Sequence, residues 1–169
     1  MPNLLIIHHS RTGAAQQMAE AAADAAVRAL AETFGPYAIV RLLPAVDARP
    51  ADLLDSDGYL FAAPENLAAL SGPMKDFFDR CYYPLLGRLN GRPYALMIAA
   101  GSDGTGAARQ ATRIATGWRL RPIADPLIIR THAQTEAAIL APKILDEDDL
   151  DRCRELGGTM GAGLGMGIF

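Results

Sequence analysis

The feature of this chain that most restricts its fold is the alternation of short apolar runs with longer stretches of helix-forming residues. The first run, Asn3–His8, is followed by Ala14–Thr33, which is rich in Ala, Gln, Glu and Leu. Short, nearly continuous apolar runs are typical of strands buried on both faces, and the second stretch has high helix propensity. Because strands that alternate with helices form parallel sheets, we expect a parallel sheet with helices on both of its faces.

The same alternation continues to the end of the chain. Further strands are expected at Tyr37–Leu43, Tyr59–Ala63, Tyr94–Ala99 and Pro122–Arg130, the last one strongest at Leu127–Ile129. Further helices are expected at Met74–Tyr83 after Pro73, at Ala107–Trp118 and at Asp146–Ile168, with a short helical turn at Arg49–Asp52. Five strands in 169 residues predict a single α/β domain, residues 1–169. We expect three layers, α/β/α, around a doubly wound five-stranded sheet of order 2-1-3-4-5.

Composition excludes several classes of function. Hydrophobic residues make up 50% of the chain, which is too apolar for a disordered protein, and the net charge of -3 gives no reason to expect a nucleic-acid partner. The apolar stretches are shorter than the ~20 residues that cross a bilayer, so no membrane partner is expected. The N-terminus has no signal-peptide pattern, and Cys81 and Cys153 lack disulfide or metal spacing, so we expect a cytoplasmic protein with reduced thiols.

Doubly wound sheets bind ligands beyond the carboxyl ends of their strands, where the strand order reverses. In this chain that rule selects three loops, at His9–Ala15, Pro64–Gly72 and Ala100–Gly106. Any binding site is expected where these three loops meet.

The first loop has the composition of an anion site. It presents Ser10, Arg11, Thr12, Gly13 and Ala14 directly before an expected helix. Hydroxyl donors, a guanidinium and the free N–H groups of a helix N-terminus suit a phosphate group. The alternative is that the two hydroxyl residues only cap the helix. The loop carries neither the P-loop pattern nor the three spaced glycines of a dinucleotide-binding fingerprint.

The other two loops could contact a flat ring. The residues concerned are Pro64, Glu65, Asn66 and Leu67 in the second loop and Gly101, Ser102, Asp103 and Gly104 in the third. A mixture of apolar and hydrogen-bonding groups suits an aromatic ligand, and glycine lets the backbone approach closely. The alternatives are an ordinary surface loop and a plain connecting turn.

One segment resembles a known family. Pro64-Glu65-Asn66, followed by the stretch from Ser71 to Arg80 (SGPMKDFFDR), is similar to a signature of flavodoxin-like NAD(P)H-dependent FMN reductases and quinone reductases. The resemblance extends from Asn3 to about Ile129. It implies a flavodoxin-like fold with FMN as the cofactor, NAD(P)H as electron donor and a small acceptor such as a quinone.

The resemblance also assigns roles to the three loops. Ser10, Thr12 and Gly13 correspond to the FMN phosphate loop, and Gly101 to Gly104 correspond to a third flavin-contacting loop. The flavin would carry out the redox chemistry, so no catalytic side chain is expected. Glu65-Asn66 and Ser102-Asp103 are the candidates for contact with the ring edges. A homodimer or homotetramer is expected.

Three positions depart from the family pattern. Ala14 and Ala15 stand where relatives carry further phosphate donors, and Leu67 stands where many have an aromatic residue. Each lost neutral hydrogen bond is worth about 0.5–1.5 kcal/mol, so FMN should bind more weakly, with Arg11 offsetting part of the loss. Two alternatives therefore stay open: a flavodoxin-like electron carrier, and a flavin-free binding module of the same fold.

Three further features carry structural expectations. His8 and His9 are neighbours on a strand and point to opposite faces, so no metal site is expected. Trp118 is expected to pack in the core or against a second subunit, with stacking on a flavin as the alternative. The glycine-rich C-terminal segment is expected to form a helix that packs tightly on the sheet or on a second subunit, with frayed final residues.

Overall fold

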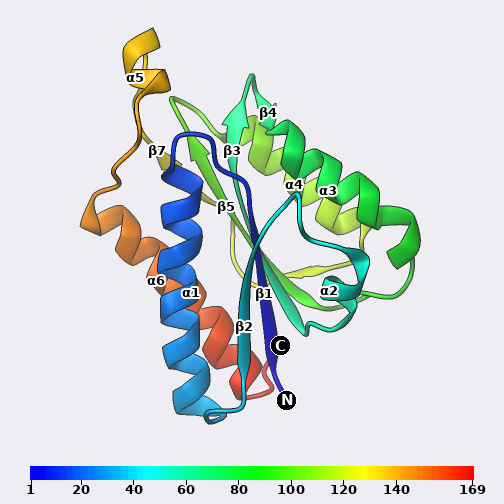
Figure 1. Cartoon of the computed structure of the whole chain (residues 1–169). Helices are drawn as coiled ribbons and strands as arrows, with labels where there is room; N and C mark the ends of the chain where they lie inside the picture. The colour runs from blue at the N-terminus through cyan, green and yellow to red at the C-terminus, as the bar shows by residue number, and fades with distance from the viewer.

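A computed structural model describes residues 1–169 as three layers around a central parallel sheet (Figure 1). The parallel strands are β1 (Asn3–His8), β2 (Ile39–Pro44), β3 (Gly58–Asn66), β5 (Pro93–Ala100), β6 (Arg121–Pro122) and β7 (Leu127–Arg130). The order is β2-β1-β3-β5, and both β6 and β7 pair with the far side of β5. The expected flavodoxin-like order 2-1-3-4-5 is confirmed, with the fifth strand divided into β6 and β7.

The division of the fifth strand has a local cause. Pro122 and Pro126 lie at and between the two pieces, and proline has no N–H to donate to a sheet ladder. Strand β5 therefore pairs with β6 near its start and with β7 near its end. The apolar pattern predicted one strand, because hydrophobicity alone does not show that the two prolines lack backbone N–H donors.

Helices cover both faces of the sheet. One face carries α1 (Ala14–Thr33) and α6 (Glu147–Gly165), and the other carries α2 (Pro50–Leu54), α3 (Gly72–Tyr82) and α4 (Thr105–Gly117). A short 3-10 helix, η1 (Tyr83–Leu85), follows α3. The helix α5 (Glu136–Leu140) buries no residue, and it projects beyond the carboxyl ends of the strands (Figure 1). It was not expected from the sequence.

The contact between α1 and α6 is built from small residues. Gly157 and Gly161 of α6 lie against the backbone of α1, where an added Cβ at Gly157 would overlap the carbonyl of Ala22 and one at Gly161 would lie 2.7 Å from that of Ala26. The glycines thus let two helix backbones meet. The tight packing expected of the C-terminal helix is found against α1, in addition to the sheet.

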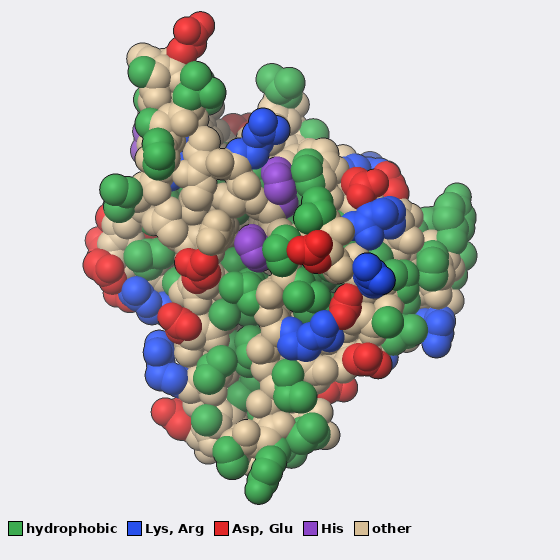
Figure 2. All heavy atoms as spheres, viewed as in Figure 1, with side chains coloured by type: hydrophobic (Ala, Val, Ile, Leu, Met, Phe, Trp, Pro, Cys, Tyr) green, Lys and Arg blue, Asp and Glu red, His purple; other side chains and the backbone are tan.

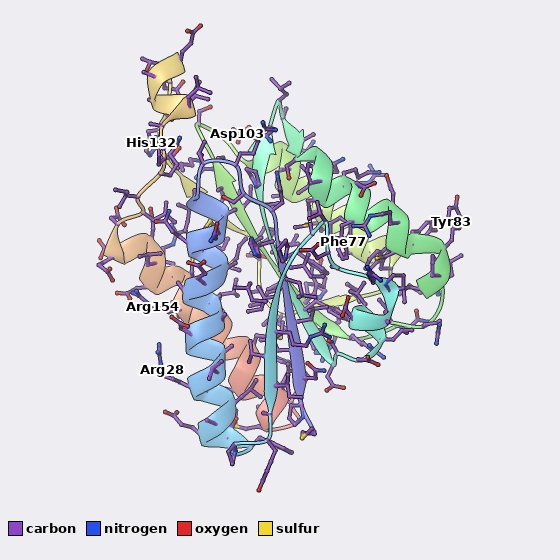
Figure 3. The ribbon with its side chains drawn as sticks, viewed as in Figure 1. Arg28, Phe77, Tyr83, Asp103, His132 and Arg154 are labelled. Carbon is purple, nitrogen blue, oxygen red and sulfur yellow. The ribbon has the colours of Figure 1, made fainter.

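The opposite face is built from rings. Phe61 of β3 lies 5.1 Å from Phe78 of α3, and Phe78 lies 5.3 Å from Trp118, both edge to face. Phe77 points into this core, whereas Tyr83, the first residue of η1, points outward (Figure 3). The predicted core position of Trp118 is confirmed.

The second loop is more ordered than expected. Strand β3 continues to Asn66, and β4 (Ala69–Leu70) folds back on it as an antiparallel hairpin. The tip is formed by Leu67 and Ala68, with φ of 52° and 65°. Such positive angles usually favour Gly, Asn or Asp, so Leu-Ala gives no turn signal. The sequence therefore predicted a loop where the chain forms a hairpin.

Acidic and basic side chains are interspersed over the face shown in Figure 2, with no field of one sign. None of the helices combines the length and hydropathy needed to cross a bilayer. Cys81 and Cys153 are buried free thiols, one on each face of the sheet.

Candidate functional site

A cavity of about 210 Å³ lies at the carboxyl edge of the sheet. It is bounded by the loop after β1, by the end of β3, by the loop after β5, and by the segment that joins β7 to α6. In Figure 1 this edge is at the top, beneath the projecting α5. The site therefore lies at the switch point that the strand order predicts.

The loop after β1 presents unpaired donors to this cavity. Gly13, with φ of 101°, places the start of α1 so that its own N–H donates to Ser10 Oγ at 3.1 Å. The backbone N–H groups of Thr12, Ala14 and Ala15 donate to no group of the chain. Ser10 therefore closes the loop without capping the helix, and the helix N-terminus is free to bind an anion.

A distant segment braces this loop. We call residues 141–146 the strap, because they run from α5 across the start of α1. The backbone N–H of Lys143 donates to the Thr12 carbonyl at 2.7 Å, and the Lys143 carbonyl accepts from Gln17 Nε2 at 2.7 Å. The Leu145 N–H donates to Gln17 Oε1 at 3.0 Å. Three hydrogen bonds thus fix the strap, one to the loop and two to Gln17 in the first turn of α1.

Glu65 connects the second loop to the third. Its two carboxylate oxygens accept the backbone N–H groups of Gly104 at 2.9 Å and Ala107 at 3.0 Å. A carboxylate is stabilising at a helix N-terminus, and the helix-capping residue Gly104 has no side chain of its own to fill that role. Glu65 lines the cavity while both of its oxygens are engaged with α4, so it positions the backbone around the site.

The third loop turns its polar side chains outward. Ser102 and Asp103 are exposed, and Asp103 Oδ1 accepts from Thr105 Oγ1 at 2.8 Å. This hydrogen bond, with a second one from the Thr105 N–H and the nearby charges of Arg130 and Arg109, lowers the pKa of the Asp103 carboxyl. Asp103 and His132 lie at the same end of the molecule as the cavity (Figure 3). Gly101, and not its polar neighbours, lines the cavity.

Two histidines end β1 beside the site. His9 Nδ1 lies 2.8 Å from the hydroxyl of the buried Ser71, at the start of α3. Burial lowers the pKa of His9, and the positive charges of Arg11 and His8 lower it further. Burial also lowers the pKa of His8, which Glu20 of α1 partly opposes. No three His, Cys, Asp or Glu side chains gather into a metal-binding group.

The structure brings most of the candidate residues together. Those that line the cavity are Ser10, Arg11, Thr12, Ala14, Pro64, Glu65, Asn66 and Gly101. Those that lie outside its lining are Gly13, Leu67, Ser102, Asp103 and Gly104. Leu67 is fully exposed at the hairpin tip, and Gly104 packs against Ile128.

Sequence reasoning did not name eight of the lining residues as candidates, among them the wall formed by residues 139–143. The additional lining residues are Ala15, Ala99, Ala100, Thr131, Ala133, Ile139, Leu140 and Lys143. Ala15 and Ala100 lie within two of the loops that the carboxyl-edge rule selects, and the neighbouring strand ends at residues 99 and 131 follow from the same rule. Residues 139–143 carried no signal, because a five-residue helix and a strap have no periodicity to detect.

A sequence profile described as NADPH-dependent FMN reductase matches residues 8–134, about three quarters of the chain. The chain belongs to this family. The match includes the first three walls of the cavity and ends before the strap.

Curated relatives carry two kinds of name. A flavodoxin of Aquifex aeolicus is 29% identical over 162 residues, which cover 93% of this chain and 84% of the relative. An NAD(P)H dehydrogenase (quinone) of Acidithiobacillus ferrooxidans is 32% identical over 94 residues, about 47% of either chain. The relatives of this family member thus include both a flavodoxin and a quinone dehydrogenase.

Solved structures agree on the fold. A flavodoxin from the domain Archaea superposes with a TM-score of 0.74 at 15% identity, covering 96% of this chain and 98% of that one. A WrbA-like flavodoxin from Agrobacterium tumefaciens superposes with a TM-score of 0.72 at 16% identity, covering 97% and 98%. At these identities the likeness establishes the flavodoxin-like fold of this family member.

Proposed function

We propose that the cavity binds FMN and that the protein uses it to pass electrons from NAD(P)H to a small acceptor such as a quinone. The observation that carries the proposal is the set of unpaired N–H donors at Thr12, Ala14 and Ala15, beside Arg11, in a member of the FMN reductase family. The nearest carboxylate in the lining, Glu65, has both oxygens occupied, so it does not compete for those donors.

The residues present fit FMN. The loop after β1 would hold the phosphate through backbone N–H groups and the Arg11 guanidinium. Pro64, Asn66 and Gly101 would flank the ring, since they line the same cavity from the end of β3 and from the loop after β5. When bound, FMN would supply the electron-transfer chemistry that no side chain here can provide.

The side chains around the cavity would orient the ring and exclude water from it. Glu65 fixes the end of β3 against α4, and Ile139 and Leu140 add an apolar wall. An apolar wall limits water at the ring, which favours transfer to the intended acceptor. The choice of electron donor rests on the NADPH-dependent FMN reductase family, and the class of acceptor rests on the quinone dehydrogenase relative.

The first experiment is a fluorescence titration of the purified protein with FMN and with riboflavin, which lacks the phosphate. We expect saturable quenching with FMN and weaker binding of riboflavin. Rapid oxidation of NADPH in the presence of a soluble quinone is then expected of the FMN-loaded protein. If neither flavin binds, the flavin-free module becomes the better description.

A double variant tests the phosphate loop. Thr12→Ala with Gly13→Asp places a negative charge at the proposed phosphate position and should abolish the preference for FMN. The matched control is Thr116→Ala with Gly87→Asp, because Gly87 also has positive φ, at 72°, but lies far from the cavity. If both double variants keep the wild-type FMN affinity, the assignment of the phosphate loop is wrong.

An electron carrier is the second candidate, favoured by the flavodoxin relative that matches 93% of the chain. The two functions differ in what reduces the flavin. Stopped-flow mixing with NADPH should bleach the flavin within seconds in an NAD(P)H oxidoreductase. A carrier should stay oxidised until a partner reductase is added.

We also propose that residues 1–169 form one domain. Contact between α1 and α6, near the two ends of the chain, supports this proposal.

We propose in addition that the protein is a homodimer or homotetramer. Exposed Leu67, Leu140 and Ile144 at the cavity edge of the sheet support an oligomer, because apolar groups at a surface favour an interface. Light scattering after gel filtration tests it. The buried free thiols suit a reducing cytoplasm.

A further inference from the structure

Lys143 enters the cavity from outside the region that defines the family. It lines the same cavity as Ser10, Arg11 and Thr12, yet the family profile ends at residue 134. It is one of two lysines in the chain; the other, Lys75, lies on α3 and pairs with Asp79. The sequence of the first loop gives no sign that a residue about 130 positions later lies beside it.

The backbone of Lys143 is fixed against the phosphate loop. Its N–H donates to the Thr12 carbonyl and its carbonyl accepts from Gln17, each at 2.7 Å. Gln17 also donates to the Gly13 carbonyl at 2.9 Å, so one side chain holds the loop and the strap in register. The Cα and Cβ atoms of Lys143 are therefore held in place beside the free N–H groups of α1.

The ammonium group has a donor to spare. Lys143 Nζ donates to the carbonyls of Ile139 at 2.9 Å and Ala141 at 2.6 Å. An ammonium carries three N–H donors, so one is left without a partner in the chain. No ion pair includes Lys143, whereas Lys75 contacts both oxygens of Asp79. The positive charge at the cavity is thus held in place by neutral groups and is not neutralised.

This charge is placed where the family pattern is weakest. Ala14 and Ala15 offer only backbone N–H groups to a phosphate. A cation that donates to a phosphate makes a stronger hydrogen bond than a neutral hydroxyl or amide does. A lysine brought in by the strap can therefore replace donors that the loop itself lacks.

We propose that Lys143 is a ligand of the FMN phosphate, supplied by the strap in place of the donors missing at positions 14 and 15. The inference rests on the proposed function, because it assumes that the cavity takes FMN. It assigns a residue beyond the family-defining stretch to the specificity for the phosphorylated flavin.

The test compares FMN and riboflavin affinities in three variants by fluorescence quenching, without reference to activity. Lys143→Gln keeps a donor for the Ile139 carbonyl but removes the charge, and Lys143→Arg keeps the charge. Lys75→Gln is the control, at the other lysine. We expect Lys143→Gln to weaken FMN binding about tenfold, as for a lost charged hydrogen bond, and to leave riboflavin binding within twofold. Lys143→Arg should restore most of the FMN affinity.

The outcomes separate the two proposals. If the wild type prefers FMN and Lys143→Gln retains that preference in full, Lys143 is not a phosphate ligand while the proposed function stands. If Lys143→Gln weakens both flavins equally, the residue only shapes the wall, and the inference is likewise overturned. A wild type that binds FMN and riboflavin equally has no phosphate site, and one that binds neither overturns the proposed function as well.

Lysine labelling gives an independent measurement on the unmodified sequence. Acetylation by a small anhydride, followed by mass spectrometry, reports Lys143 and Lys75 separately because the chain has no other lysine. FMN should slow labelling of Lys143 several-fold more than riboflavin does, and it should leave Lys75 unchanged. Equal protection of Lys143 by both flavins contradicts contact with the phosphate.

Discussion

The two faces of the sheet build their cores by different means. On the α1 and α6 face the core holds aliphatic side chains and no ring, and alanine and glycine let the backbones of the two helices approach closely. Under α3 and α4 the contacts are made by stacked and edge-on rings around Phe61 and Trp118. Small residues leave no side chain that can move aside, whereas rings bury more apolar area for each residue. The first face should therefore fail by overpacking and the second by cavity formation.

The largest effect is expected on the ring face. Phe77→Ala removes a fully buried ring and should lower the free energy of unfolding by about 3–5 kcal/mol. The measurement is urea unfolding followed by circular dichroism. Tyr83→Ala is the control, because that ring is 77% exposed and its loss should change stability by less than about 0.5 kcal/mol. Equal losses in the two variants would contradict the cavity argument.

The contact between α1 and α6 is tested by adding one methyl group. Gly157→Ala should destabilise by about 1–3 kcal/mol, because the new Cβ would overlap the Ala22 carbonyl of α1. Gly158→Ala is the matched control: its Cβ would lie 4.0 Å from that of Ala25, so higher helix propensity should add up to about 1 kcal/mol. Melting curves that shift the same way for both variants would show that α6 does not pack on α1 as described.

One buried thiol on each face reports local opening. Burial raises the pKa of Cys81 to about 11 and that of Cys153 to about 12, so both should react slowly with alkylating reagents at pH 8. Gly157→Ala should accelerate labelling of Cys153 several-fold more than that of Cys81, since it loosens the α1–α6 face. Identical acceleration at the two thiols would mean that the two faces open together, through global unfolding, and would contradict separate local opening of the α1–α6 face.

The smallest expected effect is on pH dependence, where one histidine belongs to each face. The pKa of His8, near α1, and of His9, bonded to Ser71 at the start of α3, are both lowered mainly by burial from 6.5. The unfolded chain then binds more protons below pH 6.5, so stability should be complete above that value and fall as the solution is acidified.

Urea midpoints at pH 7.5 and 5.5 measure this change. His9→Gln and His8→Gln should each flatten the profile, and the larger change identifies the more perturbed histidine. Asp52 should not contribute in this range, because its pKa is lowered from 3.8. A wild-type midpoint that does not change between the two pH values would contradict the lowered pKa values.

The sequence predicts the features that depend on residues close together along the chain. The helix Ala14–Thr33 was predicted to the residue, since a long propensity pattern ended by Gly35-Pro36 leaves little freedom. The strand order and the edge that holds the cavity followed from strand–helix alternation. The hairpin tip at Leu67-Ala68 did not, because neither residue type favours positive φ. The family resemblance was likewise carried by two short segments close in sequence, Pro64–Asn66 and Ser71–Arg80.

The candidate site divides along the same line. Residues next to strand ends, such as Ser10 and Gly101, could be located from topology alone. The engagement of Glu65 with α4 could not, because it depends on a contact 39 residues away to Gly104. Lys143 was out of reach for the same reason: its place beside Thr12 is set by tertiary hydrogen bonds and by no local pattern.

The strap also bears on how the protein is made. During synthesis the chain leaves the ribosome N-terminus first, so the loop at residues 10–13 emerges long before its brace. The bonds from Gln17 to Lys143 and Leu145 span 126 and 128 residues. Contacts of such sequence separation form late, because the loop that they close must be ordered first. A nascent chain stalled before residue 143 can build most of the sheet but has an unbraced first loop, so cofactor loading is expected to follow release from the ribosome.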